Sequence, residues 1–85
     1  MIRYAIIIAP RAKKEIDGLD SATKERVANA LESLALHPYA GKSLKAELKG
    51  LYSYRVGDYR IIYAIINNKL LIQVVKVMHR RQAYR

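Results

Sequence analysis

The eight C-terminal residues hold the densest group of chemically useful side chains in this chain. The segment 78–85 reads MHRRQAYR and places an imidazole, three guanidinium groups and a phenol directly after an apolar stretch. Guanidinium groups bind phosphates through forked hydrogen bonds, and imidazole and phenol can exchange protons. We therefore expect this tail to contact an anion.

A second cationic pair follows from the turn signal Gly57-Asp58. A two-residue type II′ turn there places Arg55 directly opposite Arg60 on one face of a sheet. Like charges in opposed positions destabilise a sheet by roughly a few tenths to 1 kcal/mol. This cost indicates that the two guanidinium groups hold a negative group such as a phosphate between them. The alternative is that both side chains extend into solvent, where the cost is small.

The positive charge is concentrated in the second half of the chain. The 16 Lys and Arg residues against 7 Asp and Glu give a formal net charge of +9. Six basic and five acidic residues precede Lys42, whereas ten basic and two acidic residues lie from Lys42 onward. Such a basic half attracts nucleic acid, an anionic membrane surface or an acidic protein. The alternative is a solvated basic surface that keeps the protein soluble.

Length and composition limit the remaining possibilities. The 85 residues predict one domain, residues 1–85, and the absence of cysteine excludes disulfides and thiolate sites, which fits a cytoplasmic protein. We expect no signal peptide and no membrane span. The two histidines and the scattered acids lack the spacing of metal ligands, so we predict no metal and no cofactor.

The elements that must position these residues begin with a strand and two helices. Apolar residues alternate over 2–8 and predict a strand. A short helix follows and ends at Gly18. A second helix begins at Asp20 or Ser21 and runs to about Leu36, with apolar residues at helical spacing.

Three strands are predicted in the second half, after a connection over 38–50 that contains Pro and Gly. The strands are Leu51–Val56, Tyr59–Ile66 and Leu70–Met78. The order is β-α-α-β-β-β, which predicts an α+β fold. It has an antiparallel sheet with the two N-terminal helices packed on one face.

The second hairpin sets which residues share a face with Arg60. A two-residue turn at Asn67-Asn68 would place Arg60 opposite Val75, whereas a three-residue turn over Asn67–Lys69 would pair it with Lys76. We favour the second, because it separates a cationic face from an apolar one. The predicted cationic face consists of Arg55, Arg60, Lys76 and Arg80. The face toward the helices would carry Tyr54, Val56, Tyr59, Ile61, Tyr63, Val75 and Val77.

Two segments, LKGLYSYRVGDYRIIYAI and VVKVMHRRQAYR, resemble the RelE-like toxins of the RelE/ParE superfamily. The segments APRAKKEIDGL and LALHP also fit, so the resemblance covers nearly the entire chain. It implies the toxin of a type II toxin-antitoxin system, a ribosome-dependent, metal-independent endoribonuclease that cuts mRNA in the A site and inhibits translation. It also implies an acidic RelB-like antitoxin in a hetero-oligomeric complex.

The resemblance also implies roles for individual residues. Arg55, Arg60, Arg80 and Tyr84 match catalytic positions of the family, and His79 stands where RelE has lysine. Ser53 departs from the pattern, because RelE has lysine there. Residues assigned to RNA or phosphate binding are Lys45, Lys49, Ser53, Lys76, Arg81 and Arg85.

The identity of the general base stays open at this point. Cleavage of RNA without a metal needs a base for the 2′-OH, cations for the phosphorane and an acid for the leaving oxygen. Arginine does not lose its proton in proteins, so the arginines act as electrostatic stabilisers, and the candidates are Tyr84, His79 and Glu47. Tyr84 is favoured because neighbouring positive charge promotes phenolate, although its ring could instead stack on a base. His79 falls on the face opposite Arg80 if the strand is regular.

Two other functions fit the same fold. A ParE-like protein inhibits DNA gyrase without cutting nucleic acid and has no chemical need for the set of arginines and Tyr84. A non-catalytic RNA-binding module would use the basic face only to hold phosphates.

Overall fold

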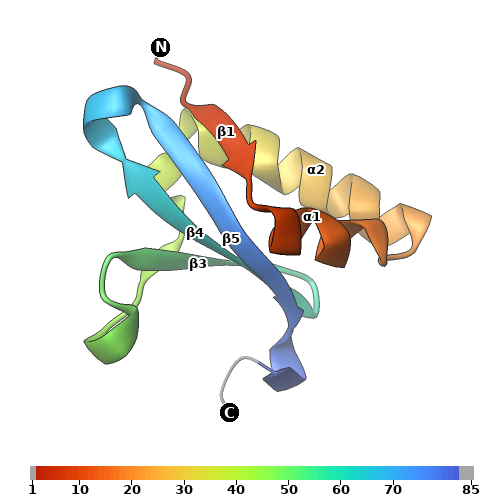
Figure 1. Ribbon diagram of the computed structural model, residues 1–85. Helices are drawn as coiled ribbons and strands as arrows, with labels where there is room; N and C mark the ends of the chain where they lie inside the picture. Colours follow the sequence, from red (N-terminus) through yellow and green to blue (C-terminus); the bar gives the residue numbers. More distant parts are fainter. Residues whose placement is uncertain (1, 83–85) are drawn as a thin grey trace.

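A five-stranded sheet with two helices on one side forms this protein (Figure 1). The computed structural model describes residues 2–82. The strands are β1 (Ala5–Ile8), β2 (Lys42–Ser43), β3 (Leu51–Val56), β4 (Tyr59–Ile66) and β5 (Leu71–His79). The helices are α1 (Pro10–Asp17) and α2 (Ser21–Leu36), and short 3₁₀ turns are η1 (Pro38–Ala40), η2 (Ala46–Leu48), η3 (Asn67–Lys69) and η4 (Arg80–Gln82). Within 2–82, neither helix is long and apolar enough to span a membrane.

The predicted α+β fold, with two N-terminal helices on one face of a sheet, is confirmed. The sheet order is β1-β5-β4-β3-β2, and the bounds of both helices and of β3 and β4 agree with the sequence pattern. The sheet is mixed and not wholly antiparallel as predicted, because β1 pairs with β5 in parallel while the other pairs are antiparallel. The short strand β2 lies inside the predicted connection over 38–50 and pairs with β3.

The core lies between α2 and the helix-facing side of the three long strands. On α2, Val27, Leu31 and Leu34 are buried, and they pack with residues that alternate along the strands. The buried strand residues in this cluster are Ile61, Tyr63, Ile72, Val74 and Val77. Burial of each large apolar side chain stabilises the fold by about 1.5–3 kcal/mol.

The first hairpin has the predicted turn and register. Gly57 has a φ of 59°, whereas Asp58 is not among the residues with positive φ, as a type II′ turn requires. Arg55 pairs with Arg60, so both guanidinium groups start from the same face of the sheet.

The predicted pairing of Arg60 with Lys76 is wrong, because Arg60 lies opposite Met78. Two added residues explain the shift. Leu70 adopts a left-handed conformation with a φ of 50° and lengthens the turn by one residue, and a bulge at Val75 adds another. Side chains alternate between the two faces of a strand, so a shift of one residue changes the face and a shift of two restores it. Because the two added residues shift the register by two, Lys76 stays on the face that carries Arg60.

The same bulge corrects one residue of the predicted core. Tyr63 pairs with Val74 and Ile62 with Lys76, so Val75 has no direct partner across the strand. Val74 is fully buried, whereas Val75 is only half-buried. Val74 therefore takes the place in the core that the pattern assigned to Val75.

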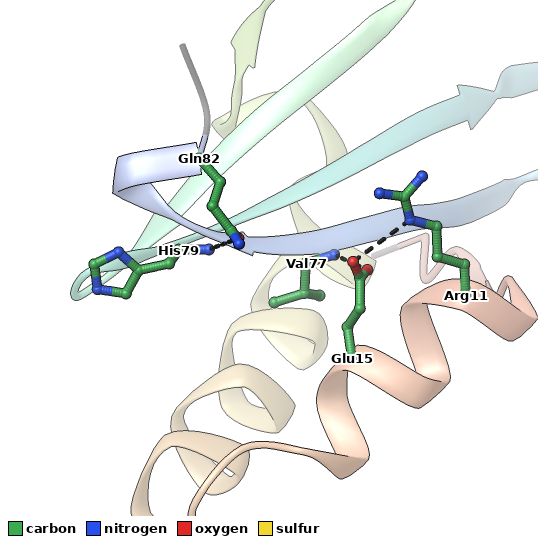
Figure 2. A network of polar contacts seen from close by, with 5 residues as sticks. All are labelled: Arg11, Glu15, Val77, His79 and Gln82. Carbon is green, nitrogen blue, oxygen red and sulfur yellow. Dashed lines mark hydrogen bonds and ion pairs between the residues drawn. The ribbon is translucent and has the colours of Figure 1, made fainter. Parts of the chain in front are cut away.

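Side chains cap the edge of β5 where β1 ends (Figure 2). The last residue of β1 lies opposite Val74, which leaves the edge beyond it without a neighbouring strand. The Val77 N–H donates to Oε1 of Glu15 on α1 at 2.9 Å, and the His79 N–H donates to Oε1 of Gln82 at 3.2 Å. These contacts satisfy donors at the unpaired edge of the strand and fix the strand end that precedes Arg80.

The hydrogen bond from Val77 to Glu15 predicts that two substitutions of Glu15 differ in their effect on the free energy of unfolding. Glu15→Ala leaves the part-buried N–H of Val77 without its acceptor and should lower the free energy of unfolding by about 1–3 kcal/mol. Glu15→Gln retains an oxygen acceptor, so it should lower the free energy of unfolding by less than Glu15→Ala does. Urea denaturation measures both, with Asp17→Ala as a control that removes only an exposed ion pair to Lys13. Equal losses in Glu15→Ala and Asp17→Ala would refute this role.

Candidate functional site

A pocket of about 190 Å³ lies on the sheet face opposite the helices. On β4 the residues alternate, and since Ile61 and Tyr63 pack in the core, Arg60 and Ile62 face the other side. The residues that line the pocket are Lys42, Leu44, Leu48, Ser53, Arg60, Ile62, Lys76 and Met78. Five of them come from β3, β4 and β5, and the segment 42–48 covers them.

The polar part of the pocket is cationic. Arg60 and Lys76 are half-buried, and Lys42 is exposed at the rim. The described lining includes no carboxylate and no imidazole. Three cations around one small pocket create a positive potential that favours an anion such as a phosphate.

The hydroxyl of Tyr63 holds the segment that brings Lys42 to this pocket. It donates to the carbonyl oxygen of Pro38 at 2.7 Å and accepts from the N–H of Gly41 at 3.0 Å. A Cβ at Gly41 would overlap that hydroxyl and lie 3.0 Å from the carbonyl oxygen of Ser53, so only glycine fits. Burial raises the pKa of Tyr63 to about 12, which keeps this hydroxyl a donor at neutral pH.

Ser53 and Ile62 form the floor of the pocket, and each is only 6% exposed. The Ser53 side chain faces away from the core, because its neighbours on β3, Tyr52 and Tyr54, pack against the core. Within the part of the chain that the structure describes, the Ser53 hydroxyl has no hydrogen-bond partner.

Arg55 and Arg80 lie at the hairpin end, away from this lining. The Nε of Arg55 donates to the carbonyl oxygen of Gly57 at 3.1 Å. The backbone N–H of Arg80 donates to the carbonyl oxygen of Asp58 at 2.7 Å, and its Nε is 3.8 Å from the Asp58 carboxylate. The predicted cationic face is therefore divided. Arg60 and Lys76 line the pocket, and Arg80 leaves the strand pattern because β5 ends one residue before it.

His79 lies on the helix-facing side of the sheet, as alternation along a regular strand predicts. It pairs with Tyr59, which packs against the core, and the two rings meet edge to face at 5.2 Å. The Arg81 N–H donates to His79 Nδ1 at 3.3 Å, so the proton of the neutral ring is on Nε2.

The remaining candidates are distributed around this region. Tyr84 and Arg85 lie outside the described residues 2–82. Lys45, Glu47 and Lys49 are exposed in and beside η2, and Arg81 is exposed in η4. Lys42 was not among the sequence candidates, because a strand of two residues produces no periodic signal.

A sequence model of a known family matches most of the chain. Residues 6–84 match the family described as the ParE toxin of the type II toxin-antitoxin system parDE. Toxin RelE of Mycobacterium tuberculosis is 30% identical over 88 residues, which cover 96% of this chain and 87% of that protein. Toxin RelG of the same organism is 30% identical over 84 residues, covering 96% and 97%.

Solved structures share the fold. The toxin-antitoxin complex RelBE2 of M. tuberculosis contains a chain with a TM-score of 0.87 and 28% identity, covering 93% of this chain and 100% of that one. The archaeal RelE–RelB complex of Pyrococcus horikoshii gives a TM-score of 0.78 at 26% identity, covering 98% and 100%. The isolated RelE toxin of Escherichia coli gives 0.77 at 25% identity, covering 89% and 83%.

The buried Tyr63 hydroxyl predicts how stability depends on pH. Its folded pKa of about 12 exceeds the ordinary value of 10.0, so its contribution is complete below pH 10 and is lost as the pH rises toward 12. The slope from this group is at most about 1.4 kcal/mol per pH unit. Tyr63→Phe should remove that slope and, by leaving two backbone groups unsatisfied, destabilise the protein by about 1–3 kcal/mol at neutral pH.

Denaturation at a series of pH values measures both effects. Tyr39→Phe is the matched control, since Tyr39 is 57% exposed. A Tyr63→Phe protein that retains the full alkaline slope of the native chain would contradict the account.

Proposed function

The chain belongs to the ParE toxin family of type II toxin-antitoxin systems, and within that family we propose that it is a RelE-like mRNA interferase. In this proposal it is a cytoplasmic endoribonuclease that cuts mRNA in the ribosomal A site and thereby inhibits translation. The likeness to the proteins named RelE and RelG supports it.

The observation that carries the proposal is the half-buried pair of cations on the open face of the sheet. Arg60 and Lys76 line one pocket whose described lining holds no acidic side chain. Cations in a partly water-excluded site stabilise a developing phosphorane more strongly than cations in bulk water. An arginine also offers two parallel N–H groups to phosphate oxygens.

The reaction that fits this chemistry is an internal transfer at phosphorus. The ribose 2′-oxygen, after losing its proton to a base, bonds to the adjacent phosphorus. The bond from phosphorus to the 5′-oxygen breaks as that oxygen takes a proton from water. The products are a 2′,3′-cyclic phosphate and a 5′-hydroxyl. In this scheme Arg60 stabilises the phosphorane. Arg80, held at the hairpin end by Asp58, donates a hydrogen bond to the leaving 5′-oxygen.

We assign the role of base to Tyr84, near the end of the cationic tail. His79 is the alternative. It is disfavoured because its ring lies on the helix-facing side and its Nδ1 already accepts from Arg81.

The proposed partner is an acidic RelB-like antitoxin in a hetero-oligomeric complex. The solved relatives from M. tuberculosis and P. horikoshii are complexes of a toxin with its antitoxin. A chain with a formal net charge of +9 favours an acidic partner that covers its cationic pocket.

A second candidate function is inhibition of DNA gyrase, which the family description favours by naming the parDE system. A gyrase inhibitor needs no phosphorane-stabilising arginine. Inhibition of supercoiling by the purified chain, without cleavage of mRNA, would establish this candidate in place of the first.

Substitution of Arg60 separates catalysis from binding. Arg60→Ala should lower mRNA cleavage by about 100-fold or more, a loss on the order of 3 kcal/mol, while ribosome binding falls much less. Primer extension on mRNA and ribosome co-sedimentation measure the two quantities. Arg80→Ala tests the same role in the tail, and Arg3→Ala is the control, since Arg3 pairs with Glu32 on the exposed surface. Equal losses in cleavage and binding would leave Arg60 only a phosphate-holding role.

Substitution of Tyr84 tests the base. Tyr84→Phe retains the aromatic ring and removes the ionisable oxygen, so cleavage should nearly cease if Tyr84 is the base and persist if the ring only stacks. The comparison variant is His79→Gln, assayed in the same primer-extension experiment. An active Tyr84→Phe protein beside an inactive His79→Gln protein would transfer the role to His79.

A further inference from the structure

The pocket on the open face of the sheet has two chemically different halves. The apolar half consists of Leu44, Leu48, Ile62 and Met78. The polar half consists of Lys42, Ser53, Arg60 and Lys76. A simple anion would need only the polar half, so the pocket fits a ligand that carries both an apolar surface and negative charge.

The Ser53 hydroxyl points to a ligand of that kind. It is buried on the pocket floor and has no hydrogen-bond partner among the described residues. A buried hydroxyl without a partner costs about 1–3 kcal/mol, so its presence is unfavourable for the free protein. A ligand with a polar edge at the floor would satisfy it.

Lys42 supplies a cation directly beside that hydroxyl. Lys42 pairs with Ser53 across β2 and β3, and both residues line the pocket. The position of β2 is set by the contacts of Tyr63 with Pro38 and Gly41, directly before Lys42. Lys42 is therefore held at the rim, where its ammonium group can meet a phosphate.

The size of the pocket limits the ligand to a small group. Its volume of about 190 Å³ lies below the roughly 300–1,000 Å³ of sites for drug-sized molecules. Leu48 remains 49% exposed at the pocket, although it is a large apolar residue. A nucleobase is flat and apolar on its faces and polar on its edge, and proteins hold single bases between apolar side chains.

We propose that this pocket is a subsite for one nucleotide of the RNA, next to the phosphate that is cut. The base lies against Leu48 and Met78 with its polar edge at the Ser53 hydroxyl, and Lys42 binds the phosphate of that nucleotide. This inference rests on the proposed nuclease function and adds to it a site that selects the base beside the cut. Lys42 and Ser53 are binding residues of this subsite.

Amide chemical shifts of the full chain test the subsite directly. Adenosine 3′,5′-bisphosphate is the probe, with inorganic phosphate and adenosine as comparison ligands. The bisphosphate should shift the Ser53 and Ile62 amides and bind about 10-fold more tightly than either comparison ligand, because it engages both halves of the pocket. Equal affinity for inorganic phosphate would overturn the proposal, since it would leave only a phosphate site.

Two exposed lysines, one at the pocket and one away from it, provide a matched pair of variants. Lys42→Met should weaken the bisphosphate by about 10-fold. Lys69→Met should leave it unchanged, because Lys69 is exposed in η3 and is not among the lining residues. Equal effects of the two variants would show general charge attraction and would overturn the subsite.

Ser53→Ala separates a ligand role from a structural one. The variant should bind the bisphosphate several-fold more weakly and should be at least as stable to urea as the native chain, because it removes an unsatisfied buried hydroxyl. Reduced stability with unchanged binding would show that Ser53 serves the fold and would contradict the proposal.

Cleavage assays distinguish failure of the subsite from failure of the nuclease function. If the native chain cleaves mRNA and the Lys42→Met and Ser53→Ala variants cleave the same positions equally fast, the subsite is wrong and the nuclease function stands. If the chain does not cleave but shows the predicted contrast in nucleotide binding, the pocket binds a nucleotide, whereas the nuclease function and the position of the pocket beside a cut are wrong. An acidic peptide that shifts the Ser53 amide where the nucleotide does not would assign the pocket to a protein partner and overturn the proposal.

Discussion

The buried hydroxyl of Tyr63 is the contact on which the open face of this protein depends. The Tyr63 side chain comes from the central strand β4, and its hydroxyl donates to the carbonyl oxygen of Pro38 and accepts from the N–H of Gly41. Tyr52 stacks on its ring at 5.6 Å and fixes the direction of the phenol. Because the chain is held there, β2 pairs with β3 and the segment 42–48 covers part of the sheet. Without this attachment the pocket would have a floor but no cover.

The sheet separates two environments, and its irregularities preserve that separation. Leu70 adds one residue to the turn before β5 and the bulge at Val75 adds one within β5, and the two shifts together keep apolar residues toward the helices. Arg60 and Lys76 remain on the other face, although they are not direct partners. A single added residue would have sent Lys76 into the core, where an unpaired ammonium is strongly unfavourable. Burial therefore constrains the register of β5 more strongly than the turn sequence does.

Sequence patterns located the long elements and the first hairpin, because each depends on local chemistry. Helical spacing in α1 and α2 and the Gly57-Asp58 turn are signals carried by neighbouring residues. The parallel partner of β1 and the bulge at Val75 depend on contacts between distant parts of the chain. Local alternation therefore could not predict them.

The candidate site shows the same division. The face shared by Arg60 and Lys76 followed from alternation, even though the predicted pairing was wrong. Lys42 joins them only because Gly41 and Tyr63 approach closely, a contact between residues 22 positions apart. Arg80 was placed by extending the strand beyond its end, where the chain instead turns toward Asp58.

A structure of this protein on the ribosome, with an mRNA whose 2′-hydroxyl at the cut is methylated, tests whether the open face of the sheet holds the phosphate that is cut. In that structure the phosphate at the intended cut should lie within about 3 Å of the Arg60 guanidinium, on the open face of the sheet. An mRNA path that leaves this face empty and crosses the helices would contradict it.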